Sequence, residues 1–242
     1  EPYHATYAAG FDGDRIVGVA AHCWNDSLVL QAPLAIEPVV REVVRASGRR
    51  VRGLVGPWAQ LVAARTALGL DDVQCAFSSH DDLYALELDA LVVPALLADG
   101  RVTCRPTRAA DLDLVAAWRV GYRVELMGAT DGPVLRGQAR EEVELWHRAG
   151  SSWVLEDAGA SVAFSGFNAR LPDVVQVGGV WTPSGLRARG YARAVVAGSL
   201  VAARTDGVTR SILFTGQDNE AARRVYLALG YRRIGDYGLA LF

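Results

Sequence analysis

The sequence predicts an α/β fold of the α+β type, in which a β-sheet is flanked by helices. A β-branched, apolar run at residues 174–180 reads as a buried strand, and an Ala/Val/Leu-rich segment with helical spacing follows it up to Ala203. Short apolar runs separated by Asp-Gly-Asp and Asn-Asp turn residues open the chain. Strand and helix patterns then alternate towards the C-terminus, as expected of a sheet covered by helices.

In the first hundred residues the patterns predict a strand meander followed by strand–helix units. Alternation of apolar residues and hairpin turns predicts three strands at 3–11, 15–23 and 27–31, and further strands are predicted at 51–55 and 82–91. Valines at helical spacing predict a helix over 37–47 that Gly48 ends, and a second helix over 58–68 precedes Gly69. Residues 94–100 read as a short connection.

From residue 101 the pattern restarts with a strand at 101–106, and Thr107 is a good N-cap for the helix expected at 111–121. The remaining expected elements are listed in chain order. They are helical segments at 122–127 and 138–149, strands at 152–156 and 161–168, the central strand and helix, a strand at 210–214, a helix at 220–229 and a terminal strand hairpin. The polar, glycine-bearing residues 129–132 are expected to form a loop.

Composition excludes several classes of protein. The 242 residues are 51% hydrophobic and 21% charged, which provides a large core and is not typical of disorder. The net charge of −2 without a basic block argues against a nucleic-acid partner, although all 25 basic residues are arginine. Cys23, Cys75 and Cys104 lack ligand spacing, so we expect no metal and a reduced, cytoplasmic protein. We expect no membrane span, because long apolar runs are missing from the sequence, and nothing in it reads as a signal peptide.

The chemistry is expected at the connection between the central strand and its helix. Thr182-Pro183 ends the strand, because proline cannot donate to a ladder, and Arg187-Ala-Arg-Gly190-Tyr-Ala192 leads into the helix. Backbone amides and the helix N-terminus converge there and attract phosphate oxygens. A single glycine between strand and helix also occurs in ordinary turns. The identity of the surrounding residues favours the phosphate site.

Arg187-x-x-Gly190-x-Ala192 resembles the RxxGxG/A pyrophosphate loop of the GNAT superfamily of acyl-CoA-dependent N-acetyltransferases. The resemblance covers residues 101–242 well and the first hundred residues weakly. It implies a mixed, largely antiparallel twisted sheet and acetyl-CoA as co-substrate. The residues that it implies for CoA binding are Val180, Trp181, Thr182, Arg187, Ala188, Arg189, Gly190, Tyr191, Ala192, Arg193, Asn219, Arg223 and Tyr226.

The same resemblance assigns two catalytic roles. The backbone N–H of Val180 would face the thioester carbonyl and stabilise the oxyanion, an effect commonly worth ~3 kcal/mol. Gly178-Gly179 just before it is consistent with a β-bulge, because a strand interior otherwise avoids glycine. Asn219 and Tyr226, seven residues apart, share one helix face. In relatives the asparagine contacts the pantetheine arm and the tyrosine protonates the departing thiolate; the alternative for Tyr226 is a core aromatic.

The general base departs from the family pattern. Some relatives carry a glutamate fourteen residues before the loop glycine, and that position here is Gln176, which cannot accept a proton for catalysis. Glu125 is the first candidate, with a solvated helix residue as the alternative. The reserves are Asp236, Tyr237 and the carboxylate of Phe242, while His22 and His147 are chemically suited but not placed near the site.

An internal repeat suggests two tandem copies of this fold. Residues 51–70 and 210–231 both read strand, turn, helix and Leu-Gly-apolar, and the helix at 37–47 corresponds to the one at 190–203 without the glycine loop. Chance similarity between two strand–helix units is the alternative. We expect residues 1–97 to be a degenerate GNAT-like half that serves as scaffold and substrate wall, and residues 98–242 to be the catalytic domain.

These features predict an enzyme that transfers an acetyl group from acetyl-CoA to a primary amine by direct attack in a ternary complex. Acidic residues in expected loops (Asp12, Asp26, Asp131 and Asp173) favour a polyamine or aminoglycoside-like amine, although acidic surface loops are also common in proteins of this charge. The alternatives are a peptide or protein N-terminal acetyltransferase and a non-catalytic acyl-CoA sensor. The chain is expected to be a monomer or a homodimer.

Overall fold

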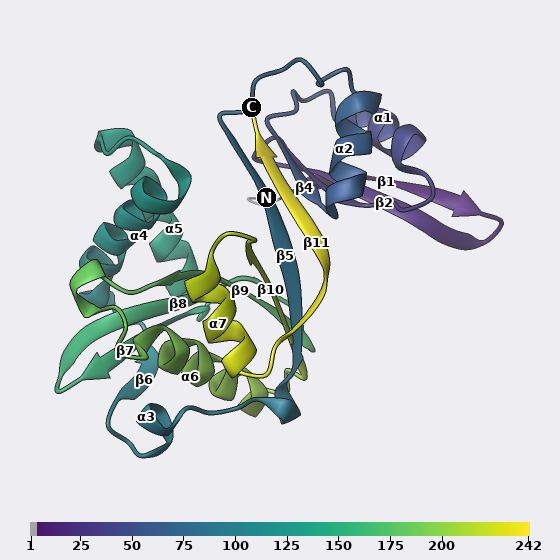
Figure 1. Ribbon diagram of the computed structural model, residues 1–242. Coiled ribbons are helices and arrows are strands. Elements are labelled where there is room, and N and C mark those ends of the chain that lie inside the picture. The colour runs from purple at the N-terminus through teal and green to yellow at the C-terminus, as the bar shows by residue number, and fades with distance from the viewer. Residues whose placement is uncertain (1–3) are drawn as a thin grey trace. The chain divides into compact units, whose positions relative to one another are not determined.

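A computed structural model describes residues 4–242, which form a mixed α/β fold with a large mixed sheet flanked by helices (Figure 1). The predicted fold class is therefore confirmed. The chain divides into two compact units. Unit 1 contains the residues up to Leu83 together with Phe214–Asp218 and Ile234–Phe242, and unit 2 contains Tyr84–Leu213 and Asn219–Arg233.

Unit 1 is a sheet covered by two helices. Its strands follow the order β1 (Ala5–Asp12), β2 (Arg15–Cys23), β3 (Ser27–Gln31), β4 (Gly53–Gly56), β11 (Arg232–Leu241) and β5 (Phe77–Glu87). The β3 and β4 strands are parallel, and the β1/β2, β2/β3 and β4/β11 pairs are antiparallel. Helix α1 (Ile36–Ser47) buries the predicted valine stripe and ends at Gly48 with a φ of +64°; α2 (Trp58–Ala67) follows β4.

Unit 2 holds the central strand and the glycine loop. Its strands follow the order β10 (Arg210–Gly216), β9 (Val174–Trp181), β8 (Ala160–Arg170), β7 (Ser152–Asp157) and β6 (Thr103–Pro106), with the end of β5 beside β10. The β9/β10 pair is parallel, and the pairs from β9 to β6 are antiparallel. The helices are α3 (Ala95–Ala98), α4 (Leu112–Met127), α5 (Pro133–Arg148), α6 (Tyr191–Thr205) and α7 (Glu220–Ala228), with short 3₁₀ turns at Leu88–Ala90, Ala109–Asp111 and Ser184–Leu186.

Alternation along the strands of unit 2 supplies a core on each face of the sheet. Val175 and Val177 of β9 pack with Val195 and Leu200 of α6 in the larger core. The opposite face is buried by α4 and α5, whose apolar side chains pack against the intervening strand residues. The members of this second core are Leu112, Val115, Val143, Trp146, Val154 and Phe164. On β9 itself Val175 and Val177 are buried and the residues beside them are half-buried, as expected of a strand whose side chains point alternately to the two faces.

The order of elements is repeated along the chain. In unit 1 three antiparallel strands lead through α1 to the parallel strand β4 and then α2, and in unit 2 β7, β8 and β9 lead through α6 to β10 and then α7. The strand β11, which comes from the end of the chain, pairs with β4 of unit 1. The strand β5, which comes from the first part of the chain, lies beside β10 of unit 2. The compact units are therefore discontinuous in sequence, and the boundary at 97/98 between two copies stays a prediction.

Several element predictions were wrong in detail. Residues 112–127 form one helix that continues through Gly121, where the missing Cβ leaves room for the Trp181 indole: a Cβ there would lie 3.2 Å from it. Helix α5 begins at Pro133, which suits a first helical position. The expected terminal hairpin is the single strand β11, and β5 starts five residues before the expected 82. The expected start of the first strand at residue 3 lies outside the described residues.

Candidate functional site

The central strand β9 carries the predicted bulge. Gly178 faces Gly166 of β8 and Trp181 faces Phe164, so three steps on β9 correspond to two on β8. Gly179 has a φ of +63°, and a Cβ there would lie 2.9 Å from the Trp146 ring of α5. Glycine is required at this position by both the backbone conformation and the close indole. The bulge prediction at Gly178-Gly179 is confirmed.

The glycine loop, residues 187–192, leads into α6, as its sequence motif predicts. Gly190 is the N-cap residue with a φ of +81°, and Ala188 also has a positive φ of +62°. The first return bond of the helix runs from the Ala194 amide to the Gly190 carbonyl at 3.0 Å, so the amides of the preceding first-turn residues have no partner within the helix. In residues 4–242 no side chain caps α6. An uncapped N-terminus preceded by left-handed residues is suited to a phosphate group.

Two orphaned polar atoms flank this loop. Thr182 Oγ1 follows β9 and Arg193 Nε lies on the first turn of α6, and both are buried without a hydrogen-bond partner among the described residues. Both residues belong to the predicted CoA-binding set. A buried donor left unpaired costs about 1–3 kcal/mol, so such atoms are expected where a ligand completes the bonding. The loop therefore fits the pyrophosphate and pantetheine groups that it was predicted to hold.

Arg187 is held by protein groups. Its guanidinium makes a bidentate ion pair with Glu125 of α4, at 2.7 and 2.9 Å, and Nε donates to the Thr182 carbonyl at 3.0 Å. Its Cζ lies 4.9 Å from the centre of the Trp181 ring. Arg189, by contrast, is exposed and donates weakly to the Gly185 carbonyl at 3.4 Å. Arg187 thus ties the loop to α4, and the carboxylate of Glu125 must leave this pair before it accepts a proton.

Helix α7 presents the predicted asparagine and tyrosine. Asn219 is its N-cap and accepts from the Ala222 amide at 3.1 Å, while Arg223 Nε donates to the Tyr84 hydroxyl at 3.3 Å. Tyr226 is 8% exposed and lies edge-on to Tyr231 at 5.9 Å. Burial raises the pKa of Tyr226 well above its usual range, so its phenol keeps its proton at neutral pH.

Tyr122 of α4 is a neighbour of Tyr226 that sequence reasoning missed. Its phenol also contributes, after burial, to the raised pKa of Tyr226. The Tyr122 ring packs edge-on to Trp181 at 6.2 Å, and the Arg119 guanidinium lies 4.5 Å from its centre. Arg119 and Tyr122 are three positions apart on one helix face, which is a weak signal because most helices contain such pairs.

The remaining candidates for the base lie elsewhere. Gln176 is half-buried and faces Ala169 and Ile212 in the sheet. The reserves Asp236, Tyr237 and Phe242 belong to unit 1, where Asp236 lies 3.4 Å from His80. The two histidines considered are hydrogen-bonded elsewhere: His22 to Ser47 at 2.7 Å, and His147 to Thr107 at 3.3 Å.

The acidic residues expected in an acceptor cleft are divided between the two units. Asp12 and Asp26 belong to unit 1, and Asp131 and Asp173 belong to unit 2. Asp26 pairs with Arg52 at 3.4 Å and Asp131 with Arg136 at 2.9 Å, so two of these carboxylates already have a cation. A polycation-binding surface built from these four residues stays a prediction.

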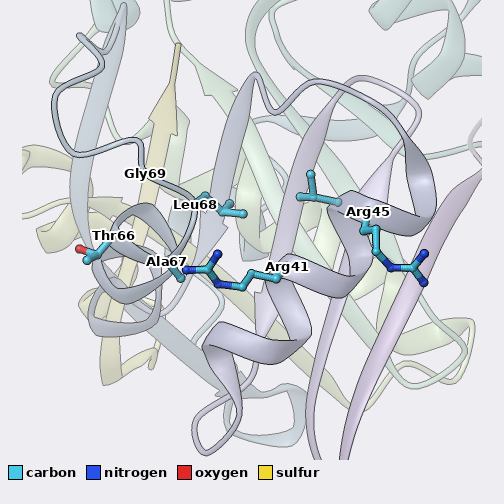
Figure 2. A pocket seen from close by; sticks show the side chains of 7 residues that line it. Arg41, Arg45, Thr66, Ala67, Leu68 and Gly69 are labelled. Atoms are coloured by element: carbon cyan, nitrogen blue, oxygen red, sulfur yellow. The ribbon is translucent and has the colours of Figure 1, made fainter.

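A surface hollow of about 530 Å³ lies in unit 1, between α1 and the end of α2 (Figure 2). Arg41 and Arg45 supply its charges, and each pairs with a glutamate of the same helix. The hollow contains none of the predicted site residues, and we place the candidate site at the β9–α6 connection. Within residues 4–242, no helix is long and apolar enough to cross a membrane, and no group of three His, Cys, Asp or Glu side chains is arranged to hold a metal ion.

Comparisons with known proteins agree with this geometry. The model of the acetyltransferase (GNAT) family matches residues 123–231. A GCN5-related N-acetyltransferase from Kribbella flavida is similar in structure, with a TM-score of 0.61, 18% identity and coverage of 99% of this chain and 90% of that chain. A GNAT-family acetyltransferase from Colwellia psychrerythraea has a TM-score of 0.56 and 16% identity, with coverage of 98% of this chain and 85% of that chain. A tandem GNAT protein from the clavulanic acid biosynthesis pathway has a TM-score of 0.56 and 14% identity, with coverage of 97% of this chain and 82% of that chain. No curated protein matches the chain. At these identities the structural likeness shows the fold.

Proposed function

We propose that the protein, whose residues 123–231 match the model of the acetyltransferase (GNAT) family, transfers an acetyl group from acetyl-CoA to the primary amine of a small molecule. The observation that carries the proposal is the glycine loop. Its N-cap Gly190 has a left-handed backbone, and orphaned polar atoms of Thr182 and Arg193 flank it. These features match what a pyrophosphate-bearing thioester needs at this connection.

The placement of each residue supports the cofactor-binding role that we propose for it. The amides of the α6 first turn and Arg193 would hold the pyrophosphate, and Thr182 would bond the polar arm that runs along the end of β9. Arg189 is exposed beside the loop and would add a charge-assisted bond. Arg187 would reach a phosphate only by leaving Glu125, and that movement would free the carboxylate. Asn219 already caps α7 through its oxygen, which leaves its amide group as the part that a ligand would contact.

Acetyl-CoA supplies an activated acyl group, whose transfer to an amine forms a C–N bond and breaks a C–S bond. The N–H of Val180, at the bulge of β9, would stabilise the carbonyl oxygen as charge develops there. Tyr226, protonated at neutral pH, would give its proton to the departing thiolate sulfur and recover one from the amine nitrogen. Glu125, once released from Arg187, would take the proton that an ammonium must lose before attack. Direct attack in a ternary complex needs no covalent nucleophile of the protein.

We propose in addition that the first half of the chain is a degenerate copy of the second. The repeated order of strands and helices supports this. The residue before α1, the helix of the first half that corresponds to α6, supports it as well. The N-cap of α1 is Ala35 with a φ of −139°, in place of the left-handed glycine of α6. An alanine in that conformation does not form the loop, so the phosphate-binding role would belong to the second half alone.

The experiment that tests the proposal measures the melting temperature with acetyl-CoA, CoA and dephospho-CoA, and then thiol release with a panel of amines. The panel contains polyamines, aminoglycosides, amino acids and short peptides, because a polyamine or an aminoglycoside is the acceptor class predicted from the acidic loops. Ligands that bind the native state raise the melting temperature. A rise with all CoA species and thiol release with an amine support the proposal. Binding without release from any amine favours a non-catalytic acyl-CoA sensor, and no rise at all refutes the phosphate loop.

A further inference from the structure

Arg119 carries an unused hydrogen-bond donor next to the bulge of β9. Its Nε and Nη2 both donate to Glu142 of α5, at 2.8 Å each. Its Nη1 is buried and has no hydrogen-bond partner within residues 4–242. The side chain is only 12% exposed, so this donor has been removed from water without a hydrogen bond to replace the one it made there. An orphaned guanidinium N–H is costly, because the cation loses hydration and gains no acceptor in return.

The surroundings hold Arg119 rigidly in this position. The guanidinium lies 4.5 Å from the centre of the Tyr122 ring and 5.2 Å from that of Trp146. The fork to Glu142 fixes the plane of the group, and the two rings leave little freedom for rotation. Nη1 lies 3.6 Å from the position that a Cβ of Gly179 would occupy, so the donor lies beside the bulge.

The local charges favour an anion. Glu142 is shared between Arg119 and Arg123, whose Nη2 donates to it at 2.8 Å. Two cations and one carboxylate leave a net charge of +1 in a half-buried cluster. Because Arg119 is the least exposed member of this cluster, its charge is screened by water less than those of the exposed arginines, which favours an anionic partner. A polyamine would be repelled here.

The position of this cluster relates it to the proposed reaction. Tyr122 packs against the Arg119 guanidinium and edge-on to Trp181, the last residue of β9. Val180, whose N–H is the proposed oxyanion donor, follows Gly179 directly. The orphaned donor therefore lies beside Gly179, the residue immediately before the proposed oxyanion donor.

We infer that Arg119 is a specificity-determining residue that binds a carboxylate of the acceptor, and that the acceptors are small amines bearing a carboxylate near the amino group, such as amino acids. Nη1 donates to the carboxylate oxygen while the neighbouring amine is directed at the acetyl carbonyl. This inference rests on the proposed function. It names the acceptor class and replaces the polycation with an acid-bearing amine.

The first test needs no variant. Thiol release is measured for a panel of L-amino acids, each beside its carboxamide and its decarboxylated amine, with spermidine included. Rates are compared per concentration of neutral amine, because these compounds differ in the pKa of their amino groups. The inference expects kcat/KM to be at least tenfold higher for an acid than for its amide, since a hydrogen bond to a charged partner is lost in the amide.

Variants then assign the effect to one side chain. Arg119→Met is expected to lower kcat/KM for the acids by about 10- to 100-fold, mainly through KM, and to change the values for the amides by less than threefold. Arg123→Met is the matched control, since it removes a cation from the same Glu142 without removing the orphaned donor, and it should preserve the preference for acids. Arg119→Lys keeps a cation for Glu142 without the planar fork, and serves as the second variant if Arg119→Met does not fold.

The outcomes separate this inference from the proposed function. If acetyl-CoA raises the melting temperature and amides or spermidine react as well as acids, the inference is wrong and the acetyltransferase proposal stands. If Arg123→Met abolishes the preference as fully as Arg119→Met, the effect is one of general charge and the role of Arg119 is refuted. If acetyl-CoA binds and no amine releases thiol, both proposals are overturned.

Discussion

Replacing Gly190 by alanine is the most direct perturbation of the candidate loop. The residue has a φ of +81°, a left-handed conformation that costs a residue with a Cβ about 1–2 kcal/mol. The nearest heavy atom to the added Cβ would be Leu96 Cδ2 at 3.7 Å, an ordinary van der Waals contact, so a clash adds nothing to this cost. The conformational strain is therefore the whole expected destabilisation.

The size of the effect follows from the length of the chain. For a domain of about this size, 1 kcal/mol lowers the melting temperature by about 2–4 °C, so Gly190→Ala should lower it by about 2–8 °C. If the loop relieves the strain by rotating out of the left-handed region, the first-turn amides of α6 turn away from the phosphates. Loss of two charge-assisted hydrogen bonds of about 1.5–3 kcal/mol each would weaken acetyl-CoA binding by roughly 100-fold or more.

Gly207→Ala is the matched control. Its φ is +93°, and a Cβ there would have no heavy atom within 4 Å among residues 4–242, but it lies at the other end of α6. Melting temperatures and acetyl-CoA dissociation constants, the latter from calorimetry, are measured for both variants. The control should melt earlier by a similar amount and bind acetyl-CoA as the unmodified chain does. Equal affinities in both variants would refute the phosphate-loop assignment.

Three further predictions concern catalysis and stability. Tyr226→Phe should lower kcat about 100-fold and leave acetyl-CoA affinity within threefold, measured by steady-state kinetics and calorimetry, and an unchanged kcat would exclude Tyr226 as the acid. Glu125→Gln should lower kcat about 100-fold without weakening acetyl-CoA binding, because it releases Arg187; a rate within twofold of the unmodified chain would show that another group or water is the base. Arg105 holds the pKa of Asp111 below its usual range, so this carboxylate stabilises the fold at pH above about 4 and the contribution is lost as pH falls through the lowered folded-state pKa. Asp111→Asn should therefore lower the melting temperature at pH 7 and have a diminishing effect towards pH 2, and an effect independent of pH would contradict this.

The sequence alone determined the local geometry of the site. The glycine at 190 and the Gly178-Gly179 pair were recognisable because only glycine readily adopts the left-handed conformations that the structure shows at 179 and 190. The β-branched run identified β9, since β-branched side chains favour strands. Each of these signals is contained in a few consecutive residues, so no knowledge of distant contacts was required.

Only the tertiary structure showed how distant residues meet. Glu125 and Arg187 are 62 positions apart and form an ion pair, and β11 leaves the second half of the sequence to pair with β4. The orphaned donor of Arg119 is visible only once Glu142, Tyr122 and Trp146 have been placed around it, because an arginine in a sequence is by default a solvated residue. Local conformation is encoded in neighbouring residues, whereas the satisfaction of a buried polar atom depends on everything that packs against it.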